Sequence, residues 1–331
     1  MNSKIDIKYD LSIIIPVYNE EESILELYNE IYHIVKSKYK YEIIFINDGS
    51  NDSSKEIIQK IIKNNKYVKL IDFFCNRGKA EALNVGFVQS KGKLVITLDA
   101  DLQDDPNEIP NLVNKINEGF DLVSGWKKKR KDPLSKTIPS KFFNFIVRLF
   151  SGIRIHDFNC GLKAYKYKTV KSISLYGGMH RFIPVLVKNK GFKVSEIEVN
   201  HRERKYGITK YGSSRLFHGL YDFITLLFIE KYFTRPLHLF GQLGLFFSFL
   251  GLFINKYLLF EWITFHSRYK EFYFEPEIDQ FTIIRPLLFL GILLLLVGIQ
   301  FVSVGLIGEL IVKLSRNKVD YRKSANFYNT D

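Results

Sequence analysis

Short apolar runs alternate with amphipathic stretches over the first 125 residues of the chain. Runs rich in β-branched residues are expected to form strands, and they cover residues 11–16, 41–47, 68–73, 94–98 and 121–124. Helical spacing fills the intervals between them. The first three runs are almost continuously apolar, which is typical of strands covered on both faces. The pattern therefore predicts an α/β fold with a doubly wound, mainly parallel sheet of the Rossmann-like kind.

Polar loops follow three of the predicted strands, at residues 16–20, 47–50 and 99–103. In a doubly wound sheet the ligand crevice lies beyond the carboxyl ends of the strands, so a functional site is expected in these loops. The regular alternation of predicted strands and helices ends at residue 125. Residues 126–215 carry two basic clusters, at 127–131 and 202–215. We interpret this region as structure that lies over the sheet on the side where a second substrate, the acceptor, would bind.

Two long apolar stretches, residues 237–260 and 286–307, follow this region. Each is long enough for the roughly 20 residues of a membrane-spanning helix, and neither shows the polar face of a soluble helix. Two buried helices of a soluble protein are the alternative. The linker at 261–285 is acidic and the tail at 313–331 is basic, which predicts an inner-membrane protein with both termini in the cytoplasm. Residues 216–233 are expected to form an interfacial helix.

The formal net charge of +13 at pH 7 indicates a polyanionic partner such as nucleic acid, anionic lipid or a phosphorylated substrate. Because the basic residues flank the apolar stretches and no aromatic platform accompanies them, nucleic acid is the least favoured of these partners. Cys75 and Cys160 are the only cysteines, which excludes a disulfide framework and a zinc site of the usual spacing. Residues 1–10 lack the apolar core of a signal peptide, so the first domain is expected to stay in the cytoplasm.

Asp99 and Asp101 follow the fourth predicted strand and form the most informative motif. Two carboxylates at a strand end can hold Mg²⁺ or Mn²⁺ while a diphosphate fills other coordination positions. Gln103 can add a neutral oxygen ligand. Acidic residues after a strand also cap the next helix, and the motif alone does not distinguish the two roles. Its position beside two other polar loops favours the metal.

Seven segments of the sequence match, in order and in spacing, the motifs of one known enzyme family. At these segments the sequence resembles the family-2 glycosyltransferases, and within them the dolichyl-phosphate mannose synthase and bactoprenol glucosyltransferase group. The two apolar stretches match the bacterial branch of this group. The matching segments are residues 15–21, 47–50, 76–80, 98–106, 159–161, 180–184, and 201–204 together with 210–212.

The resemblance implies a GT-A fold and a metal-dependent enzyme that inverts the anomeric centre while moving a sugar from a UDP- or GDP-sugar donor to a polyprenyl-phosphate acceptor. It implies a catalytic domain at residues 1–215, juxtamembrane helices at 216–235, two transmembrane helices with a short external loop at 236–312, and a basic tail at 313–331. The implied donor-binding residues are Pro16, Tyr18, Glu20, Asp48 and Asp99, and the implied metal ligands are Asp99, Asp101 and Gln103.

The resemblance also implies a catalytic arginine and a catalytic base. Arg202 is similar to the arginine that reaches the donor phosphates, and Asp157 matches the candidate base. The acceptor phosphate is expected to contact Arg130, Ser140, Lys141 and Lys210. Trp126 and Lys127 stand where the pattern has a small or β-branched residue and an arginine, so Arg130 is a choice among several bases. A solvated or lipid-binding basic face is an equal alternative for the run at 127–131.

The sequence leaves two other functions open. A sugar-phosphate nucleotidyltransferase can use a similar sheet and carboxylate pair, but it needs neither membrane spans nor an acceptor loop. A membrane scaffold that binds nucleotide-sugar without turnover is the non-enzymatic alternative. The sequence does not determine the sugar, the nucleotide or whether the chain forms a homo-oligomer.

Overall fold

The computed structural model describes residues 7–128, 134–206, 235–268 and 278–316. The chain separates into two compact units, Met1–Leu226 and Leu227–Asp331. The interfacial helix expected at 216–233 lies outside the described residues, as does the tail from 317 onward.

The first unit is built on a seven-stranded sheet with the strand order β3-β2-β1-β4-β6-β5-β7. Neighbouring strands run parallel except where β6 meets β4 and β5. The α/β, mainly parallel fold expected from the sequence is therefore confirmed. The strands are β1 (Tyr9–Val17), β2 (Tyr41–Asn47), β3 (Val68–Asp72), β4 (Gly92–Thr97), β5 (Leu122–Trp126), β6 (Lys163–Lys166) and β7 (Val194–Glu198).

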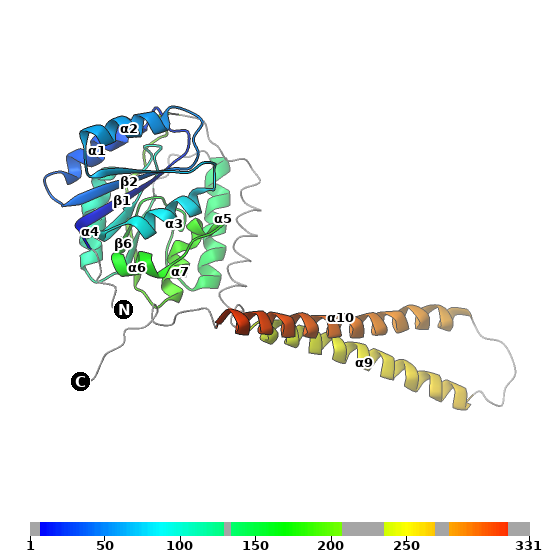
Figure 1. Cartoon of the computed structure of the whole chain (residues 1–331). Helices are drawn as coiled ribbons and strands as arrows, with labels where there is room; N and C mark the ends of the chain where they lie inside the picture. The colour runs from blue at the N-terminus through cyan, green and yellow to red at the C-terminus, as the bar shows by residue number, and fades with distance from the viewer. Residues whose placement is uncertain (1–6, 129–133, 207–234, 269–277, 317–331) are drawn as a thin grey trace, which may run out of the picture. The chain divides into compact units, whose positions relative to one another are not determined.

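Helices cover both faces of this sheet (Figure 1). They are α1 (Ile24–Val35), α2 (Ser54–Asn64), α3 (Lys79–Gln89), α4 (Ile109–Asn117), α5 (Leu134–Ser151), α6 (Tyr167–Ser172) and α7 (Ile183–Asn189), with short 3₁₀ turns η1 (Pro106–Glu108) and η2 (Met179–Phe182). The two-sided cover explains the uninterrupted apolar runs of β1 and β2, because side chains on both faces of these strands are buried.

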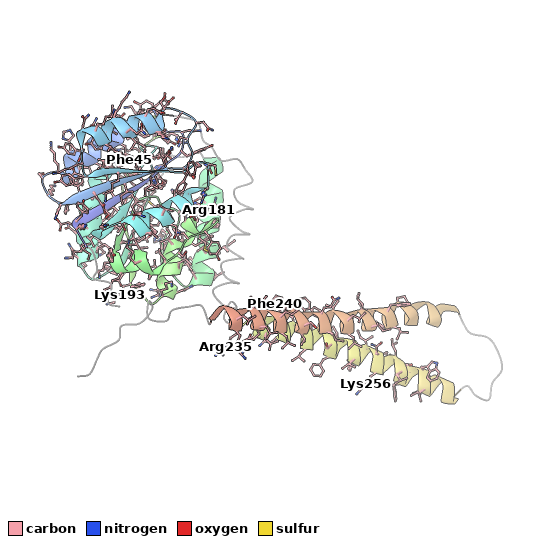
Figure 2. The ribbon with its side chains drawn as sticks, viewed as in Figure 1. Phe45, Arg181, Lys193, Arg235, Phe240 and Lys256 are labelled. Atoms are coloured by element: carbon pink, nitrogen blue, oxygen red, sulfur yellow. The ribbon has the colours of Figure 1, made fainter. Side chains whose placement is uncertain are left out.

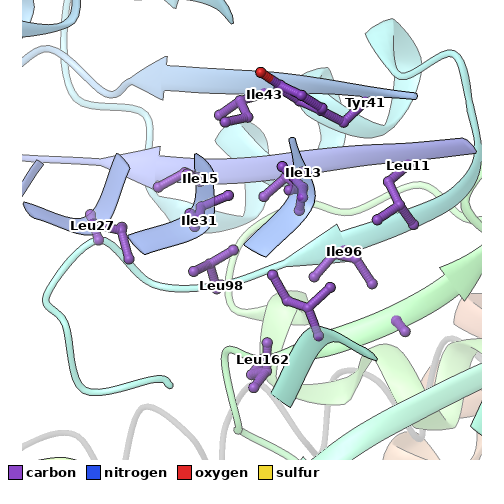
Figure 3. Close-up of a cluster of buried hydrophobic side chains, with 14 of the residues drawn as sticks. Leu11, Ile13, Ile15, Leu27, Ile31, Tyr41, Ile43, Ile96, Leu98 and Leu162 are labelled. Atoms are coloured by element: carbon purple, nitrogen blue, oxygen red, sulfur yellow. The ribbon is translucent and has the colours of Figure 1, made fainter. Parts of the chain in front are cut away.

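The main core lies between the sheet and helices α1, α2 and α4. Alternate β1 side chains Leu11, Ile13 and Ile15 point into it and meet Leu27 and Ile31 of α1 (Figure 3). The period of two in β1 and the helical spacing of α1 therefore place the apolar positions of both elements on one interface.

The opposite face of β1 packs on α3. A Cβ atom added to Gly86 of α3 would lie 2.6 Å from Cγ2 of Ile14, so glycine permits the close approach of helix and strand. The expectation that the third run is covered on both faces was wrong, because β3 is an edge strand with several half-exposed side chains.

The second unit is a pair of long helices, α9 (Pro236–Arg268) and α10 (Ile278–Arg316). Glycines lie where the two helices approach: a Cβ atom on Gly244 would sit 2.6 Å from the carbonyl oxygen of Gly298, and the same separation holds between Gly251 and the carbonyl oxygen of Gly291. Small residues at the contact let two helical backbones pack closely, as in membrane helix pairs.

These helices contain two candidate membrane spans, Pro236–Thr264 and Pro286–Leu314, with mean hydropathy of 1.8 and 2.7. Only 11% of the most apolar part of each span is buried, whereas the core helix of a soluble protein would be mostly buried. Large apolar side chains such as Phe249 and Leu293 are exposed along both helices, and Lys256 lies on the exposed side of α9 (Figure 2). The length and composition predicted for the two apolar helices are therefore found.

Candidate active site

The strand order reverses between β1 and β4, because β2 and β3 follow β1 on one side whereas β4 begins the other side. The loops that leave β1 and β4 therefore diverge from the same carboxyl edge, and the loop after β2 lies beside them. Such a reversal opens a crevice in doubly wound sheets. All three polar loops singled out in the sequence meet at this edge.

The loops after β1 and β2 are joined by hydrogen bonds. The backbone N–H of Asn19 donates to Ser50 Oγ at 3.0 Å, and the backbone N–H of Asn51 donates to Asn19 Oδ1 at 2.8 Å. The backbone N–H of Glu20 donates to Ser54 Oγ at 3.0 Å. Asn19 adopts φ 52°, a left-handed conformation that asparagine tolerates better than most residues. The two loops therefore form one rigid rim.

Three of the expected donor-binding residues lie on or beside this rim. Pro16, Tyr18 and Glu20 are all partly exposed at the carboxyl end of β1. Pro16 does not end the strand, which continues to Val17, and it pairs with β2 alone. A proline fits there because no N–H is required on the side facing β4.

Asp48 is buried and shapes a second loop. Its two carboxylate oxygens accept hydrogen bonds from the backbone N–H groups of Arg77 at 2.7 Å and Gly78 at 2.9 Å. Burial raises the pKa of Asp48, and the two N–H donors oppose this effect. Gly49, at φ 68°, lets the loops touch, because a Cβ there would lie 2.5 Å from the carbonyl carbon of Cys75. Asp48 thus positions the segment that leads into α3.

The loop after β4 carries the two aspartates of the predicted metal motif. Asp99 forms an ion pair with Lys79, which is the first residue of α3. Asp101 accepts a hydrogen bond from Arg204 at 3.1 Å. Between the aspartates and α4, Leu102 has φ 60°, a conformation that costs free energy for a residue with a branched side chain. The loop is therefore held in an uncommon conformation at the carboxyl edge of the sheet.

The two aspartates differ in electrostatic environment. Burial alone would raise the pKa of Asp99, but the charges of Lys79 and then Lys127 outweigh burial and hold that pKa below its usual range. Burial and the neighbouring charges of Asp99 and Asp104 raise the pKa of Asp101. The raised pKa of Asp101 reflects this crowding of carboxylates, and a bound cation would relieve the repulsion between them.

Gly161, in the segment Asn159-Cys-Gly, lets Asp99 approach the start of β6. A Cβ at this position would lie 2.6 Å from Asp99 Cγ and 2.7 Å from Asp104 Oδ2. The segment thus has a physical reason for its glycine, since any side chain would displace the first aspartate of the motif.

The donor set fits a divalent cation with oxygen ligands. Asp99 and Asp101 supply carboxylates, and Gln103, whose backbone N–H donates to Asp101 Oδ1 at 3.2 Å, supplies an amide. In the described part of the chain no three His, Cys, Asp or Glu side chains group as a metal site. A cation held here would therefore need oxygen ligands from a bound substrate, which a diphosphate can provide.

Residues 200–206, here called the strap, run beside the metal-motif loop. The backbone N–H of Arg202 donates to the carbonyl oxygen of Gln103 at 3.0 Å, and His201 pairs with Asp104 in an isolated antiparallel bridge. Lys205 forms an ion pair with Glu26 of α1 at 2.8 Å. These contacts fix the strap across the carboxyl edge of the sheet.

In the structure the guanidinium of Arg202 contacts carboxylates other than those of Asp99 and Asp101. Its guanidinium binds both carboxylate oxygens of Glu30 on α1, at 2.9 and 2.7 Å, and Asp105 Oδ1 at 2.7 Å. The guanidinium that faces the metal motif belongs to Arg204, which contacts Asp101 at 3.1 Å and Glu20 at 3.5 Å.

Asp157, the expected catalytic base, is buried at 1% exposure. Its Oδ1 accepts a hydrogen bond from the backbone N–H of Asn159 at 3.2 Å, and its carbonyl oxygen lies 3.4 Å from Ser124 Oγ. The carboxylate therefore shapes the turn that leads into Gly161. Its charge also acts on Lys163, which places it near the interior wall of the site.

The basic run after β5 is not a uniform solvated face. Lys127 is almost buried and forms an ion pair with Asp104 at 2.7 Å, whereas Lys128 pairs with Glu198 at the surface. Ser140 and Lys141 lie on α5, where Lys141 is exposed. The expected acceptor residues Arg130 and Lys210 lie outside the described residues.

Sequence reasoning missed two residues of the site, Lys79 and Arg204. Lys79 occurs within the recognised segment 76–80, but its partner Asp99 lies 20 residues away and only the fold joins them. Arg204 belongs to the recognised segment 201–204, in which the resemblance assigned a role to Arg202 alone.

Comparisons with known proteins agree with this geometry. The model described as Glycosyl transferase family 2 matches residues 12–174. Dodecaprenyl-phosphate galacturonate synthase of Rhizobium johnstonii is 33% identical over 310 residues, which cover 92% of this chain and 88% of that protein. Undecaprenyl-phosphate 4-deoxy-4-formamido-L-arabinose transferase of Shewanella sediminis is 34% identical over 323 residues, 97% of this chain and 92% of that protein.

Among solved structures, the complex of Mycobacterium tuberculosis glucosyl-3-phosphoglycerate synthase with Mn²⁺, uridine diphosphate and phosphoglyceric acid resembles the first unit's architecture. Its TM-score is 0.53 at 18% sequence identity, and the match covers 67% of this chain and 78% of that chain. At this identity the likeness shows the fold alone.

Proposed function

The chain belongs to glycosyl transferase family 2 and is a glycosyltransferase, and from this premise we propose that it transfers a sugar from a nucleotide-sugar to polyprenyl phosphate with inversion at the anomeric carbon. The observation that carries the proposal is the pair of aspartates at the strand reversal, with Arg204 facing Asp101. The product is a polyprenyl-phosphate sugar.

The acceptor class is supported by two independent features. The relatives named above carry polyprenyl phosphates in their names and align with more than nine-tenths of the chain, so the alignment includes the apolar helices. A lipid acceptor also gives the two candidate spans a function, because an enzyme anchored in the membrane meets its lipid substrate at the membrane surface.

The donor is proposed to lie along the rim formed by the loops after β1 and β2. Tyr18 and Pro16 would cover the base, while Glu20 and Asp48 would accept hydrogen bonds from base or ribose donors. Asp99, Asp101 and Gln103 would hold Mg²⁺ or Mn²⁺ together with the diphosphate. When bound, the cation neutralises the charge of the departing nucleoside diphosphate.

The protein's own groups carry the rest of the chemistry. Arg204 is proposed to move from Asp101 to the diphosphate as charge builds on the leaving group. Arg202 is proposed to assist indirectly, because its contacts with Glu30 and Asp105 hold the strap in place. The acceptor phosphate would be positioned by Arg130, Ser140, Lys141 and Lys210, so that it attacks the anomeric carbon in line.

Asp157 is proposed to orient the acceptor more than to accept a proton. A phosphate monoester has a second pKa of roughly 6, so a lipid phosphate near neutral pH is already largely dianionic. Unlike a sugar hydroxyl, it needs little help from a general base. The buried position of Asp157, whose carboxylate accepts a hydrogen bond from the backbone of Asn159, supports a role in orienting the acceptor phosphate through the structure of this turn.

The proposed arrangement is an inner-membrane protein with a catalytic domain at residues 1–215, interfacial helices at 216–235, two transmembrane helices at 236–312 and a basic tail at 313–331. Both termini are proposed to face the cytoplasm, because the acidic linker at 261–285 separates two more basic flanks.

Protease accessibility in intact cells tests this topology. Epitope tags placed before residue 1 and after residue 331 are expected to resist external protease, and a tag inserted next to Glu275 is expected to be cleaved. The positive-inside bias supplies the reason. A control lysis should expose all three tags, and cleavage of either terminal tag in intact cells would reverse the proposed orientation.

Acceptor dependence of donor cleavage tests the proposed reaction. Purified protein in detergent is incubated with a nucleotide-sugar and a divalent cation, and the release of nucleoside diphosphate is measured with polyprenyl phosphate, with the corresponding polyprenyl alcohol, and with neither lipid. Release is expected to require the phosphate. Equal release without lipid would indicate hydrolysis, and equal release with the alcohol would contradict a phosphate nucleophile.

A further inference from the structure

A narrow pocket opens beside Asp99, on the inner side of the metal-motif loop. We call it the Lys163 pocket. Its cavity volume of about 10 Å³ holds roughly one water-sized group, so it can take a single polar substituent but not a sugar ring. Its polar lining comes from α3, β4, the 159–161 turn, β6 and η2, and consists of Lys79, Thr97, Asp99, Asn159, Lys163, Tyr165 and His180.

Lys163 is the unusual member of this lining. The residue is 3% exposed, and its ammonium group donates to the carbonyl oxygen of Cys160. Within the described residues no carboxylate lies within ion-pairing distance of its Nζ, whereas the neighbouring buried lysines, Lys79 and Lys127, each have an aspartate partner. Burying an ammonium without a paired anion is unfavourable, so an anion supplied by a ligand would stabilise it.

The groups around Lys163 also favour the binding of an anion. Burial first, together with the charge of Lys79, lowers the pKa of Lys163 and outweighs the opposite effect of Cys160, Asp157 and Asp99, so these neighbours do not fully compensate the charged form. His180, on the same wall, has a buried Nδ1 with no hydrogen-bond partner in the described structure. Burial and the charge of Lys79 also lower the pKa of His180, so its ring is neutral and can donate one N–H.

Asn159 adds an amide to the lining. An ammonium, an imidazole N–H and an amide N–H line this space and can donate to one oxyanion group, while Leu83, Leu98 and Ile183 supply the apolar part of the lining. Because the pocket shares Asp99 with the proposed donor site, a substituent of the donor sugar is within its range.

From this geometry we propose, resting on the function proposed above, that the Lys163 pocket receives the carboxylate of a uronic acid donor sugar, with Lys163 as its charge partner and His180 and Asn159 as hydrogen-bond donors. A neutral hexose would place a hydroxymethyl group there and leave the ammonium uncompensated. Donor choice would then depend on charge, and a site built to pair a charge discriminates strongly against an analogue that lacks it.

Matched donors test the proposal directly. UDP-glucuronate and UDP-galacturonate are compared with UDP-glucose and UDP-galactose, which differ only in carrying a C6 hydroxyl instead of a carboxylate. Glycolipid formation on polyprenyl phosphate is followed for wild type, Lys163→Met and Lys166→Met. Lys166 lies on the same strand and pairs with Asp121, so it is a matched lysine outside the pocket.

Wild type is expected to prefer one of the uronates over its neutral counterpart by about 10-fold or more in kcat/KM. Lys163→Met is expected to lower kcat/KM for that uronate about 30-fold while changing the neutral donor less than about 3-fold. Lys166→Met should behave as wild type. Lys163→Arg, which keeps the charge, is expected to retain the preference.

Other outcomes overturn the proposal. An equal loss with both donor classes, together with a higher KM for polyprenyl phosphate, would show that Lys163 serves the acceptor phosphate. An equal loss without that change would show a structural role. If Lys163→Met does not fold, the test is the wild-type ratio of kcat/KM for uronate and neutral donors. A wild-type preference for neutral donors would contradict the proposal that the pocket binds a carboxylate. Absence of glycolipid from every donor would instead refute the proposed function.

Discussion

Replacing Asp101 with alanine is expected to lower kcat for sugar transfer by about 1,000-fold or more while the protein stays folded. Asp101 is the aspartate whose pKa is raised by burial and by the charges of Asp99 and Asp104, so a cation bound beside it would relieve the repulsion among these carboxylates. Without that carboxylate, the charge that develops on the leaving diphosphate loses its main compensation. Excess EDTA should reduce wild-type turnover to a similar extent.

A matched control separates chemistry from folding. Asp10, at the amino end of β1, is exposed and accepts a hydrogen bond from the backbone N–H of Lys40, so it lies at the opposite end of the strand from the site. Asp10→Ala should keep nearly full activity. Both variants are compared by thermal unfolding and by transfer kinetics at several Mg²⁺ and Mn²⁺ concentrations. Undiminished turnover of Asp101→Ala, or of wild type in EDTA, would refute metal-assisted transfer.

The two arginines of the strap are expected to differ sharply when each is changed to alanine. Arg204→Ala should lower kcat about 100-fold with little change in the unfolding temperature, because its guanidinium faces Asp101 and Glu20 at the crevice. Arg202→Ala should lower the unfolding temperature and reduce kcat less than about 10-fold, because its contacts with Glu30 and Asp105 are structural.

Arg204→Lys refines the comparison. Lysine restores a point charge but not the planar pair of donors, so a partial recovery of kcat is expected. The measurement is single-turnover transfer with unfolding monitored in the same detergent. If Arg202→Ala loses activity as severely as Arg204→Ala while remaining equally stable, the donor-phosphate role would return to Arg202.

The parallel half of the sheet could be predicted from sequence because its signals are local. The runs that became β1 and β2 are long, apolar and rich in β-branched residues, and their boundaries differ from the prediction by at most two residues. β6 has only four residues, two of them lysines, and its antiparallel place between β4 and β5 depends on contacts far along the chain. Nothing in its own pattern indicates that position.

The positions of the two aspartates at the candidate site could be predicted from the sequence, but the positions of the buried lysine side chains around them could not. Asp99 and Asp101 follow a strand directly, so topology alone locates them. The lysines that neutralise the interior come from three separate elements: Lys79 begins α3, Lys127 follows β5 and Lys163 begins β6. A run such as 127–131 reads as one basic surface in sequence, whereas the fold buries its first member against Asp104. Burial of a charge is a tertiary property that periodicity does not encode.

This site is expected to join a sugar to the phosphate of a polyprenyl lipid, and the mass of the product is the most direct test of that reaction. Purified protein is incubated with polyprenyl phosphate, a divalent cation and a panel of UDP- and GDP-sugars, and the lipid fraction is analysed by mass spectrometry. We expect a lipid heavier than the acceptor by one sugar residue, formed one-to-one with nucleoside diphosphate and absent with Asp101→Ala. A nucleotide-sugar made from sugar phosphate, or donor binding without any new lipid from any donor, would contradict it.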